Sequence, residues 1–359
     1  MLTSRTHNAQ AGALTTDTPS TLIKLEKKEG DLSFLGKSGN KYTPSLMTSQ
    51  EKEDYFKFFT TEEGVDILPY VYKQSSDAYD QLVKNCPEYY IFHDEVNIIK
   101  NRRDIFKKYL SGIREIIEIG PGSDHAITHK TLPILSYAND VQSYHIIDNS
   151  AEYLAEAHNF VKNNTSKIDI YSLKADLFSN LDIKIKQKYN GPKCVLSFGI
   201  TLGNFLVSDQ SHIIGQIKKM TDRNDLLIMS VDTNHEVRSL LSAYSGKYNY
   251  ELVRGALEYF AKINPSFLPH INSFAMKCVW NSCLNAVETY FVAKDNLLFS
   301  LDNFGPIKIS NGQKLKGIRS HKHRVEVVQA LLSQNGFETL EILSYSNADR
   351  IKTFICRKI

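Results

Sequence analysis

Residues 114–127 read Arg-Glu-Ile-Ile-Glu-Ile-Gly-Pro-Gly-Ser-Asp-His-Ala-Ile. A short apolar run containing Ile116, Ile117 and Ile119 ends at Gly120 and Gly122, and a segment compatible with a helix follows. This order is typical of a buried parallel strand that brings a ligand to the carboxyl edge of a sheet. Glycine lets the backbone approach a ligand closely and adopt a positive φ, and a helix N-terminus offers free N–H groups. A glycine turn alone is a weak signal, so its meaning depends on the residues downstream.

The sequence beyond this turn alternates short apolar strands with helical segments. Helical periodicity over residues 151–163 and 211–219 separates some of these strands. Buried strands that alternate with helices predict a doubly wound parallel α/β sheet with right-handed connections. An amphipathic helix over 324–334 and strands at 339–346 and 353–357 predict an antiparallel edge that closes the sheet. The predicted parallel strands cover residues 116–119, 143–147, 168–173, 194–198 and 225–230.

Two regions lie outside this alternation. The region before the turn predicts helices, one of which ends at Pro87 and another of which covers residues 96–110. Residues 236–324 carry most of the late aromatic side chains and predict an inserted unit, helical at first and then antiparallel. Its predicted strands cover residues 273–280, 285–293 and 307–309.

The composition excludes several classes of function. The 359 residues are 42% hydrophobic and 23% charged, with a formal net charge of +3, so no basic footprint for nucleic acid is expected. The five cysteines form no CxxC pair and no Cys/His metal spacing, which indicates reduced thiols and no metal site. No apolar run approaches the roughly 20 residues that span a bilayer, and the N-terminus lacks a signal-peptide core. We therefore expect a soluble cytoplasmic protein with neither a nucleic-acid nor a membrane partner.

Glycine or polar residues follow the first four predicted parallel strands. The glycine turn follows the first, Asp148 the second and Asp176 the third, and the fourth is followed by Gly199, Thr201 and Asn204. All these positions lie at the carboxyl edge, where such sheets bind ligands. Asp148 suits the two hydroxyls of a ribose, and Asp176 suits the exocyclic amine of adenine, so the set predicts an adenosine-binding cleft. The alternative is that both aspartates are helix N-caps.

The spacing distinguishes between adenosine ligands. A dinucleotide fingerprint needs a third glycine, where this chain has His125, and an acid about 20 residues on, whereas Asp148 lies well beyond. The chain also has no G-x-x-x-x-G-K-[ST] phosphate loop. S-adenosylmethionine (SAM) fits better, because its sulfonium carries no phosphates to cradle and two glycines suffice.

The predicted domains follow from this cleft. Residues 1–50 are expected to be a largely disordered leader, and residues 51–93 a helical part that joins the substrate domain. The SAM-binding, Rossmann-like domain is predicted to comprise residues 94–234 and 325–359. The inserted α+β substrate-binding domain is predicted to cover residues 235–324.

Four groups of residues carry a family resemblance. They are Tyr79-Asp80-Gln81-Leu82 with Pro87-Glu88-Tyr89-Tyr90, Gly199-Ile200-Thr201-Leu202-Gly203-Asn204-Phe205, Asp232 with Arg238, Ala243 and Tyr244, and Lys322 with Arg324. From about residue 68 to its end the sequence resembles the histidine Nα-methyltransferases of ergothioneine biosynthesis, a branch of the class I SAM-dependent methyltransferases. The resemblance implies SAM as the cofactor and S-adenosylhomocysteine as its product.

The resemblance also implies roles for individual residues. By position, the α-amino and α-carboxylate groups of the substrate are held by Tyr72, Tyr89, Asn204 and Tyr244, of which Tyr89, Asn204 and Tyr244 form the catalytic set. An amide and phenols bind these groups without burying a full charge, and phenol rings stabilise a methylated ammonium by about 0.5–2 kcal/mol. The cofactor-binding set expected beside them is Glu118, Gly120, Gly122, Asp148, Asp176, Leu177, Gly199 and Thr201.

The chain departs from the family at the substrate side chain. Histidine-specific members present a Glu and a Ser, two residues apart, to the imidazole, and the matching positions here are Ile318 and Ser320. Isoleucine cannot accept the imidazole N–H, and an unpaired buried N–H costs about 1–3 kcal/mol, so histidine should bind poorly. Ile318 alone favours an apolar or aromatic amino acid. Arg319, with His321 and His323 close by, either faces an anionic or polar substrate side chain or faces solvent.

The sequence therefore predicts a SAM-dependent N-methyltransferase of secondary metabolism. Its expected partner is a small-molecule amine or amino acid. The enzyme is expected to methylate the α-amino group of an amino acid or amino-acid-derived metabolite, and the departure at Ile318 predicts that this acceptor is not histidine. Two alternatives stay open. One is methylation of another nucleophile, such as a guanidine, a carboxylate or a larger metabolite. The other is a non-catalytic SAM-binding subunit.

Overall fold

A computed structural model describes residues 48–359 except 63, 74–75, 176–188, 302–303 and 346–349. The predicted leader over residues 1–50 lies outside this part of the chain except for its last three residues, which cap and begin helix α1 (Ser49–Thr60). The cap is a capping box, in which the Thr48 hydroxyl and the Glu51 carboxylate satisfy each other's backbone N–H groups. Within the described residues no helix is long and apolar enough to cross a membrane.

The larger unit contains a seven-stranded sheet with the order β11-β12-β5-β4-β1-β2-β3. Strands β1 to β5 are parallel to one another, while β12 runs antiparallel between β5 and β11. This confirms the predicted doubly wound sheet with an antiparallel edge. The strands are β1 (Glu115–Ile119), β2 (Ser143–Asp148), β3 (Asp169–Lys174), β4 (Lys193–Ser197), β5 (Leu226–Asp232), β11 (Phe337–Leu343) and β12 (Ile351–Lys358).

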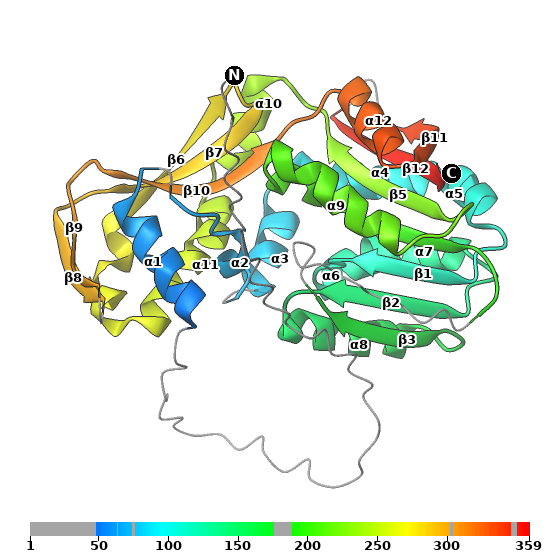
Figure 1. The fold of residues 1–359 in the computed structure, drawn as a ribbon, viewed down its shortest axis with the longest axis horizontal. Helices are drawn as coiled ribbons and strands as arrows, with labels where there is room; N and C mark the ends of the chain where they lie inside the picture. Colours follow the sequence, from blue (N-terminus) through cyan, green and yellow to red (C-terminus); the bar gives the residue numbers. More distant parts are fainter. Residues whose placement is uncertain (1–47, 63, 74–75, 176–188, 302–303, 346–349) are drawn as a thin grey trace, which may run out of the picture.

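Helices cover both faces of this sheet (Figure 1). Successive residues of a strand point to opposite faces of the sheet, so each strand packs against the helices on both sides. Ile117 packs in one apolar cluster with helices α9 (Val207–Lys219) and α12 (Val325–Gln334). Ile116 packs in the other cluster, with helices α4, α5, α7 and α8. These helices cover Tyr90–Asn101, Arg103–Leu110, Leu132–Tyr137 and Ala151–Asn164.

The prediction of one continuous helix over residues 96–110 is wrong. The structure has two helices there, α4 and α5, which meet at Arg102. The Arg102 backbone leaves the helical region, and its Nε donates to the carbonyl of Ser344 at 3.2 Å. Neither proline nor glycine marks this break, so apolar periodicity alone runs through it.

The smaller unit lies beside the larger one (Figure 1), and an aromatic core fills the space between its helices and strands. Tyr55 and Phe59 of α1 contact Phe260 of helix α11 (Lys247–Ile263) and Phe267. Helix α10 covers Val237–Tyr244. A three-stranded antiparallel sheet has the order β10-β7-β6, and β8 pairs with β9. These strands are β6 (Phe274–Asn281), β7 (Ala286–Ala293), β8 (Leu297–Leu301), β9 (Gly305–Ile309) and β10 (Lys314–His321).

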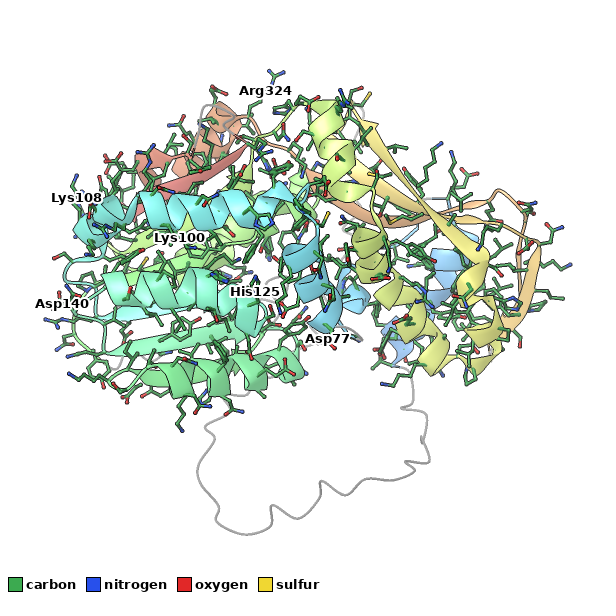
Figure 2. All side chains as sticks on the ribbon, turned by 180° about the vertical axis from the view of Figure 1, so that it is seen from behind. Asp77, Lys100, Lys108, His125, Asp140 and Arg324 are labelled. Carbon is green, nitrogen blue, oxygen red and sulfur yellow. The ribbon has the colours of Figure 1, made fainter. Side chains whose placement is uncertain are left out.

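Strands β8 and β10 were not predicted. The β10 sequence mixes lysine, arginine and glycine with apolar residues, so its alternation is weak. Its partner strand β7 is almost completely buried and determines the pairing, which is a tertiary effect. Seen from behind, Asp77 and His125 lie where the two units meet, whereas Lys108 and Asp140 lie at the far end of the sheet (Figure 2).

Candidate active site

A cavity of about 270 Å³ opens at the carboxyl ends of the parallel strands. Strand β1 lies between β2 and β4 in the sheet, so the chain winds in one direction from β1 to β2 and in the other direction to reach β4. Doubly wound sheets bind their ligands at such a switch point, at the carboxyl ends of the strands. Helices α2 (Leu68–Val71), α3 (Ser76–Asn85) and α11 contribute residues to the other wall. The predicted site residues that line the cavity are Tyr72, Tyr89, Gly120, Gly122, Asp148, Gly199, Thr201, Asn204, Tyr244 and Ile318.

The glycine turn lines one end of the cavity, which is called the cofactor end because the sequence predicts SAM there. Gly120 and Gly122 have φ angles of 60° and 81°, which L side chains rarely adopt. The Gly120 N–H donates to the Ile147 carbonyl at 2.8 Å, which ties the turn to the end of β2. A Cβ on Gly120 would meet no protein atom within 4 Å, so it would project into the open cavity. A ligand can therefore lie against bare backbone here, as the fit of SAM requires.

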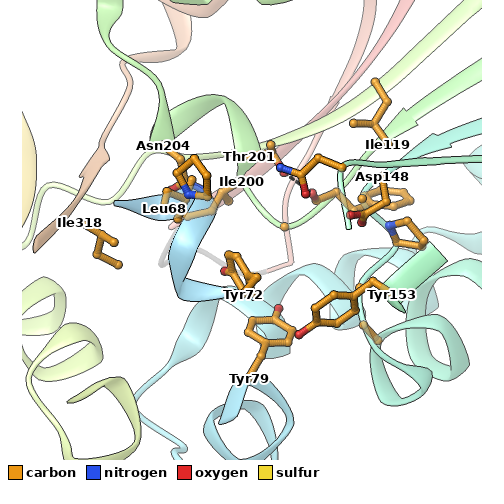
Figure 3. A pocket seen from close by; sticks show the side chains of 18 of the residues that line it. Leu68, Tyr72, Tyr79, Ile119, Asp148, Tyr153, Ile200, Thr201, Asn204 and Ile318 are labelled. Carbon is orange, nitrogen blue, oxygen red and sulfur yellow. Dashed lines mark hydrogen bonds between the residues drawn. The ribbon is translucent and has the colours of Figure 1, made fainter. Parts of the chain in front are cut away.

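Asp148 lies at the end of β2 and lines the same end of the cavity (Figure 3). The N-cap of α8 is Ser150, whose hydroxyl accepts from the Tyr153 N–H, so Asp148 is not the helix cap. One oxygen of Asp148 accepts from the Ser150 N–H at 2.8 Å, which orients the carboxylate. Burial raises the pKa of Asp148, and backbone N–H groups oppose this rise. Asp176 and Leu177 lie outside the described residues, but the preceding Ala175 lines the cavity.

Glu118 does not line the cavity, although it was predicted to bind the cofactor. It is buried in β1 and accepts from the Tyr144 hydroxyl at 2.6 Å and the Thr131 hydroxyl at 2.9 Å. Its strand position sends the side chain into the layer between sheet and helices. Burial raises the pKa of Glu118, and the two hydroxyl donors oppose the rise.

An ion pair that sequence reasoning missed holds the loop after β4. Glu95 is fully buried and accepts from the Gly199 N–H through both oxygens, at 2.8 and 3.1 Å. Lys130 lies 3.1 Å from Glu95 and lines the cavity. Gly199 and Ile200 both have positive φ angles, of 76° and 55°, and isoleucine rarely adopts this conformation. Glu95 and Lys130 are charged residues on faces of helices that are otherwise apolar, and this pattern is the sequence signal that could have indicated a buried ion pair.

Phenols and an amide line the other end of the cavity, which is called the acceptor end because the resemblance predicts the substrate there. The rings of Tyr89 and Tyr244 lie 6.2 Å apart at 70°, and Asn204 ends the 3₁₀ turn Thr201–Asn204. Burial raises the pKa of Tyr72 to about 12 and also raises the pKa values of Tyr89 and Tyr244. These hydroxyls therefore stay protonated at neutral pH and are available as hydrogen-bond donors.

A β-bulge directs Ile318 into the acceptor end. The pairing of β10 with β7 shifts register between Lys316 and Arg319. At this shift the Thr289 hydroxyl accepts from the Ile318 N–H at 2.9 Å and donates to the Ile318 carbonyl at 3.3 Å. Gly317 is required there, because a Cβ would lie 2.3 Å from the Thr289 hydroxyl. Bulges redirect side chains, and this one places Ile318 opposite Asp148 across the cavity (Figure 3).

Ser320 and its charged neighbours do not line the cavity. Ser320 accepts from the Tyr244 hydroxyl at 3.0 Å behind the cavity wall. Arg319 was expected to face either the substrate or solvent, but it instead donates two bonds of 2.6 and 2.8 Å to one oxygen of Glu288. His321 contacts the Leu284 carbonyl, and His323 contacts Gln210. Burial is the main cause that lowers the pKa of both histidines, so they are neutral at pH 7.

The sequence of this chain is similar to those of known SAM-dependent and N-methylating proteins. A family model described as "Histidine-specific methyltransferase, SAM-dependent" matches residues 69–358. Ergothioneine biosynthesis protein 1 of Neurospora crassa is 23% identical over 199 residues, which cover 55% of this chain and 22% of that protein. The 4-dimethylallyltryptophan N-methyltransferase of Claviceps fusiformis is 24% identical over 167 residues, 44% of this chain and 47% of the relative. The chain thus spans less than half the length of these curated relatives.

Among solved structures, a SAM-dependent methyltransferase from Clostridium acetobutylicum is similar to this chain. The match covers 78% of this chain and 96% of the chain in that structure. The two share 12% sequence identity, and the TM-score is 0.43.

Proposed function

This chain belongs to the family of SAM-dependent methyltransferases described as histidine-specific, and we propose that it methylates the α-amino group of an amino acid with an apolar or aromatic side chain rather than histidine. The observation that carries the proposal is Ile318, which the bulge in β10 places in the wall of the acceptor end. An isoleucine there leaves an imidazole N–H without an acceptor, at a cost of about 1–3 kcal/mol.

The surroundings of Ile318 support an apolar side chain. Leu68 and Leu252 line the cavity together with Ile318. Asp66 also lines it, but it lies exposed at the rim and one of its oxygens accepts from the Leu68 N–H at 3.0 Å. The Claviceps relative is named for an acceptor that is a prenylated tryptophan, an amino acid with a large apolar side chain.

The residues of the chain divide the work of the reaction. SAM, when bound, supplies the methyl group of its sulfonium, and Gly120, Gly122, Asp148 and Gly199 would hold it at the cofactor end. Asn204, Tyr89 and Tyr244 would orient the acceptor so that its amine lone pair points toward that end. The apolar wall excludes water from the reacting pair, and alignment supplies most of the acceleration. The amine must be neutral to attack, so it gives up its proton before transfer.

A panel of amino acids tests the proposal. The protein is incubated with SAM and single amino acids, and S-adenosylhomocysteine and the mass of the product are measured. We expect N-methylated products from apolar or aromatic amino acids and poor turnover of histidine. Their Nα-acetyl derivatives serve as controls and should not react, because the acyl group removes the nucleophilic lone pair.

Other outcomes would contradict the proposal in different ways. Turnover that is best with histidine would contradict the role of Ile318. Turnover of the Nα-acetyl derivatives would identify another nucleophile. Binding of SAM without turnover of any amine would indicate a non-catalytic SAM-binding subunit.

A further inference from the structure

A buried lysine lies directly behind the acceptor end of the cavity. The Lys322 side chain is fully buried, and its Nζ lies 2.7 Å from Asp232 Oδ2, which is also fully buried at the end of β5. The same Nζ donates to the Tyr244 hydroxyl at 2.9 Å and to the Ser320 hydroxyl at 3.0 Å. An ammonium group has three N–H donors, and these three acceptors satisfy them. Lys322 therefore acts on a ligand only through its neighbours.

Asp232 keeps the lysine charged and in place. Its Oδ2 also accepts from the Tyr90 hydroxyl at 2.7 Å, and its Oδ1 accepts from the Asn234 N–H at 3.0 Å. Burial by itself lowers the pKa of Lys322, but the Asp232 carboxylate and Tyr244 raise it above its ordinary value. The positive end of this ion pair faces Tyr244, with Nζ 4.5 Å from the centroid of the phenol ring.

Tyr244 is the member of this group that lines the cavity. Its oxygen accepts from Lys322, so its own proton must go to another acceptor, which is Ser320 at 3.0 Å in this structure. A ligand oxygen can take over that proton. Burial raises the pKa of Tyr244 while Lys322 opposes the rise, so the phenol stays protonated and is polarised by the cation behind it. A donor of this kind favours an anionic acceptor.

We propose that Lys322, held by Asp232, is a positioning residue that keeps Tyr244 as a hydrogen-bond donor and so makes the site select acceptors that carry a free carboxylate. The inference rests on the proposed function, because an α-amino acid presents a carboxylate beside its amine. The amine that remains after decarboxylation lacks this group. Selection between an α-amino acid and its decarboxylated amine therefore depends on Lys322 and Asp232, which lie behind the cavity wall and do not contact the ligand.

Paired probes test this selection in the full chain. Dissociation constants are measured for L-phenylalanine against phenethylamine, and for L-tryptophan against tryptamine, in the presence of S-adenosylhomocysteine. The variant combines Lys322→Met with Asp232→Asn, since removal of one partner alone would leave an unpaired buried charge. We expect the wild-type protein to prefer each amino acid over its amine, and the variant to lose about 10- to 100-fold of this preference.

A second buried ion pair provides the matched control. The buried Lys193 lies 3.4 Å from the buried Asp225 and 2.7 Å from the exposed Asp222, at the opposite edge of the sheet from the cavity. Lys193→Met with Asp225→Asn should reduce stability but keep the preference. An unchanged preference in the Lys322/Asp232 variant would overturn the inference and leave the proposed function intact. A wild-type protein that binds and methylates none of the amino acids would instead contradict the proposed function.

Tyr244→Phe shows whether Lys322 acts through the phenol. This substitution keeps the ring and removes the hydroxyl, so it should lower the preference as much as the Lys322/Asp232 variant does. Combination of the two should give no further loss, because both remove the same interaction. A full additional loss in the Tyr244→Phe background would overturn the inference.

A measurement on the unaltered ion pair covers the case in which the variant does not fold. 3-Fluorotyrosine is placed at position 244 or at position 89, and its ¹⁹F shift is followed against pH. Tyr89 is buried in the same cavity wall, where burial and neighbouring tyrosines raise its pKa, whereas Lys322 donates to the Tyr244 hydroxyl. We expect residue 244 to titrate at the lower pH. Equal titration of the two residues would overturn the inference.

Discussion

At the scale of single residues, we propose that Ile318 decides which acceptor side chain fits. It lines the cavity where histidine-specific relatives are expected to have a carboxylate, so Ile318→Glu should supply an acceptor for an imidazole N–H. We expect kcat/KM for histidine to rise by about tenfold or more, and kcat/KM for apolar amino acids to fall. Ile318→Leu is the control and should keep the wild-type order. Equal effects of Glu and Leu on histidine would show that this position does not contact the acceptor.

Asp148 is the residue on which the cofactor assignment depends most. Its carboxylate faces the cavity, so Asp148→Ala should remove a charged hydrogen-bond acceptor worth about 1.5–3 kcal/mol, and SAM affinity should fall roughly 10- to 100-fold. Calorimetric titration with SAM measures the effect. Asp148→Asn keeps one acceptor oxygen and should lose less. Unchanged affinity in the alanine variant would contradict the position of the cofactor in this cleft.

The titration of the acceptor amine, and not that of the site phenols, determines the expected pH dependence. Burial raises the pKa of Tyr72 to about 12 and raises those of Tyr89 and Tyr244, so all three phenols stay protonated as the amine loses its proton. We expect kcat/KM to rise about tenfold per pH unit until the amine is neutral, and then to stay level up to about pH 10. A profile measured between pH 6.5 and 10 checks this. A fall in kcat/KM below pH 9.5 would show that a required acid ionises in that range.

At the scale of elements, the bulge in β10 gives Ile318 its direction. The Thr289 hydroxyl makes both hydrogen bonds to the Ile318 backbone, so Thr289→Val should release the bulge while keeping the volume of the side chain. We expect a loss of stability of about 1–3 kcal/mol and a weaker preference for apolar over polar amino acids. Thr289→Ser retains the hydroxyl and should keep the preference. If Val and Ser variants show the same preference, the bulge does not control specificity.

At the scale of the whole molecule, the aromatic core of the smaller unit joins segments that are far apart in the sequence. Phe59 is fully buried and contacts the rings of Phe260 and Phe267, so Phe59→Ala should cost about 3–5 kcal/mol of unfolding free energy. Urea unfolding measures this cost. Phe56 lies on the same helix, is half-buried and stacks on the partly exposed Phe304, so Phe56→Ala should cost much less. Equal costs would show that α1 does not belong to this core.

Most of the larger unit was predictable from sequence because its signals are local. The β1 run ends at Gly120, and the β2 run ends at Asp148, so both strand ends could be read within one or two residues. The break at Arg102 was not predictable, since it depends on a bond to Ser344, more than two hundred residues away. Strand β10 was missed for a similar reason, because its pairing is determined by the buried strand β7.

The sequence by itself determined the glycine turn after β1 and the acid at the end of β2, where SAM is expected to bind. These features are local in the sequence, because a positive φ favours glycine at that position and an apolar run ends at the residue that follows it. The sequence assigned Tyr72, Tyr89, Asn204, Tyr244 and Ile318 to the acceptor only by resemblance, and the tertiary structure decided how they are arranged. It turned Ile318 into the cavity through a bulge, drew Ser320 behind the wall and placed Lys322 against Tyr244. These contacts join residues from different elements, and the packing of β5, α10 and β10 against one another brings them within hydrogen-bonding distance.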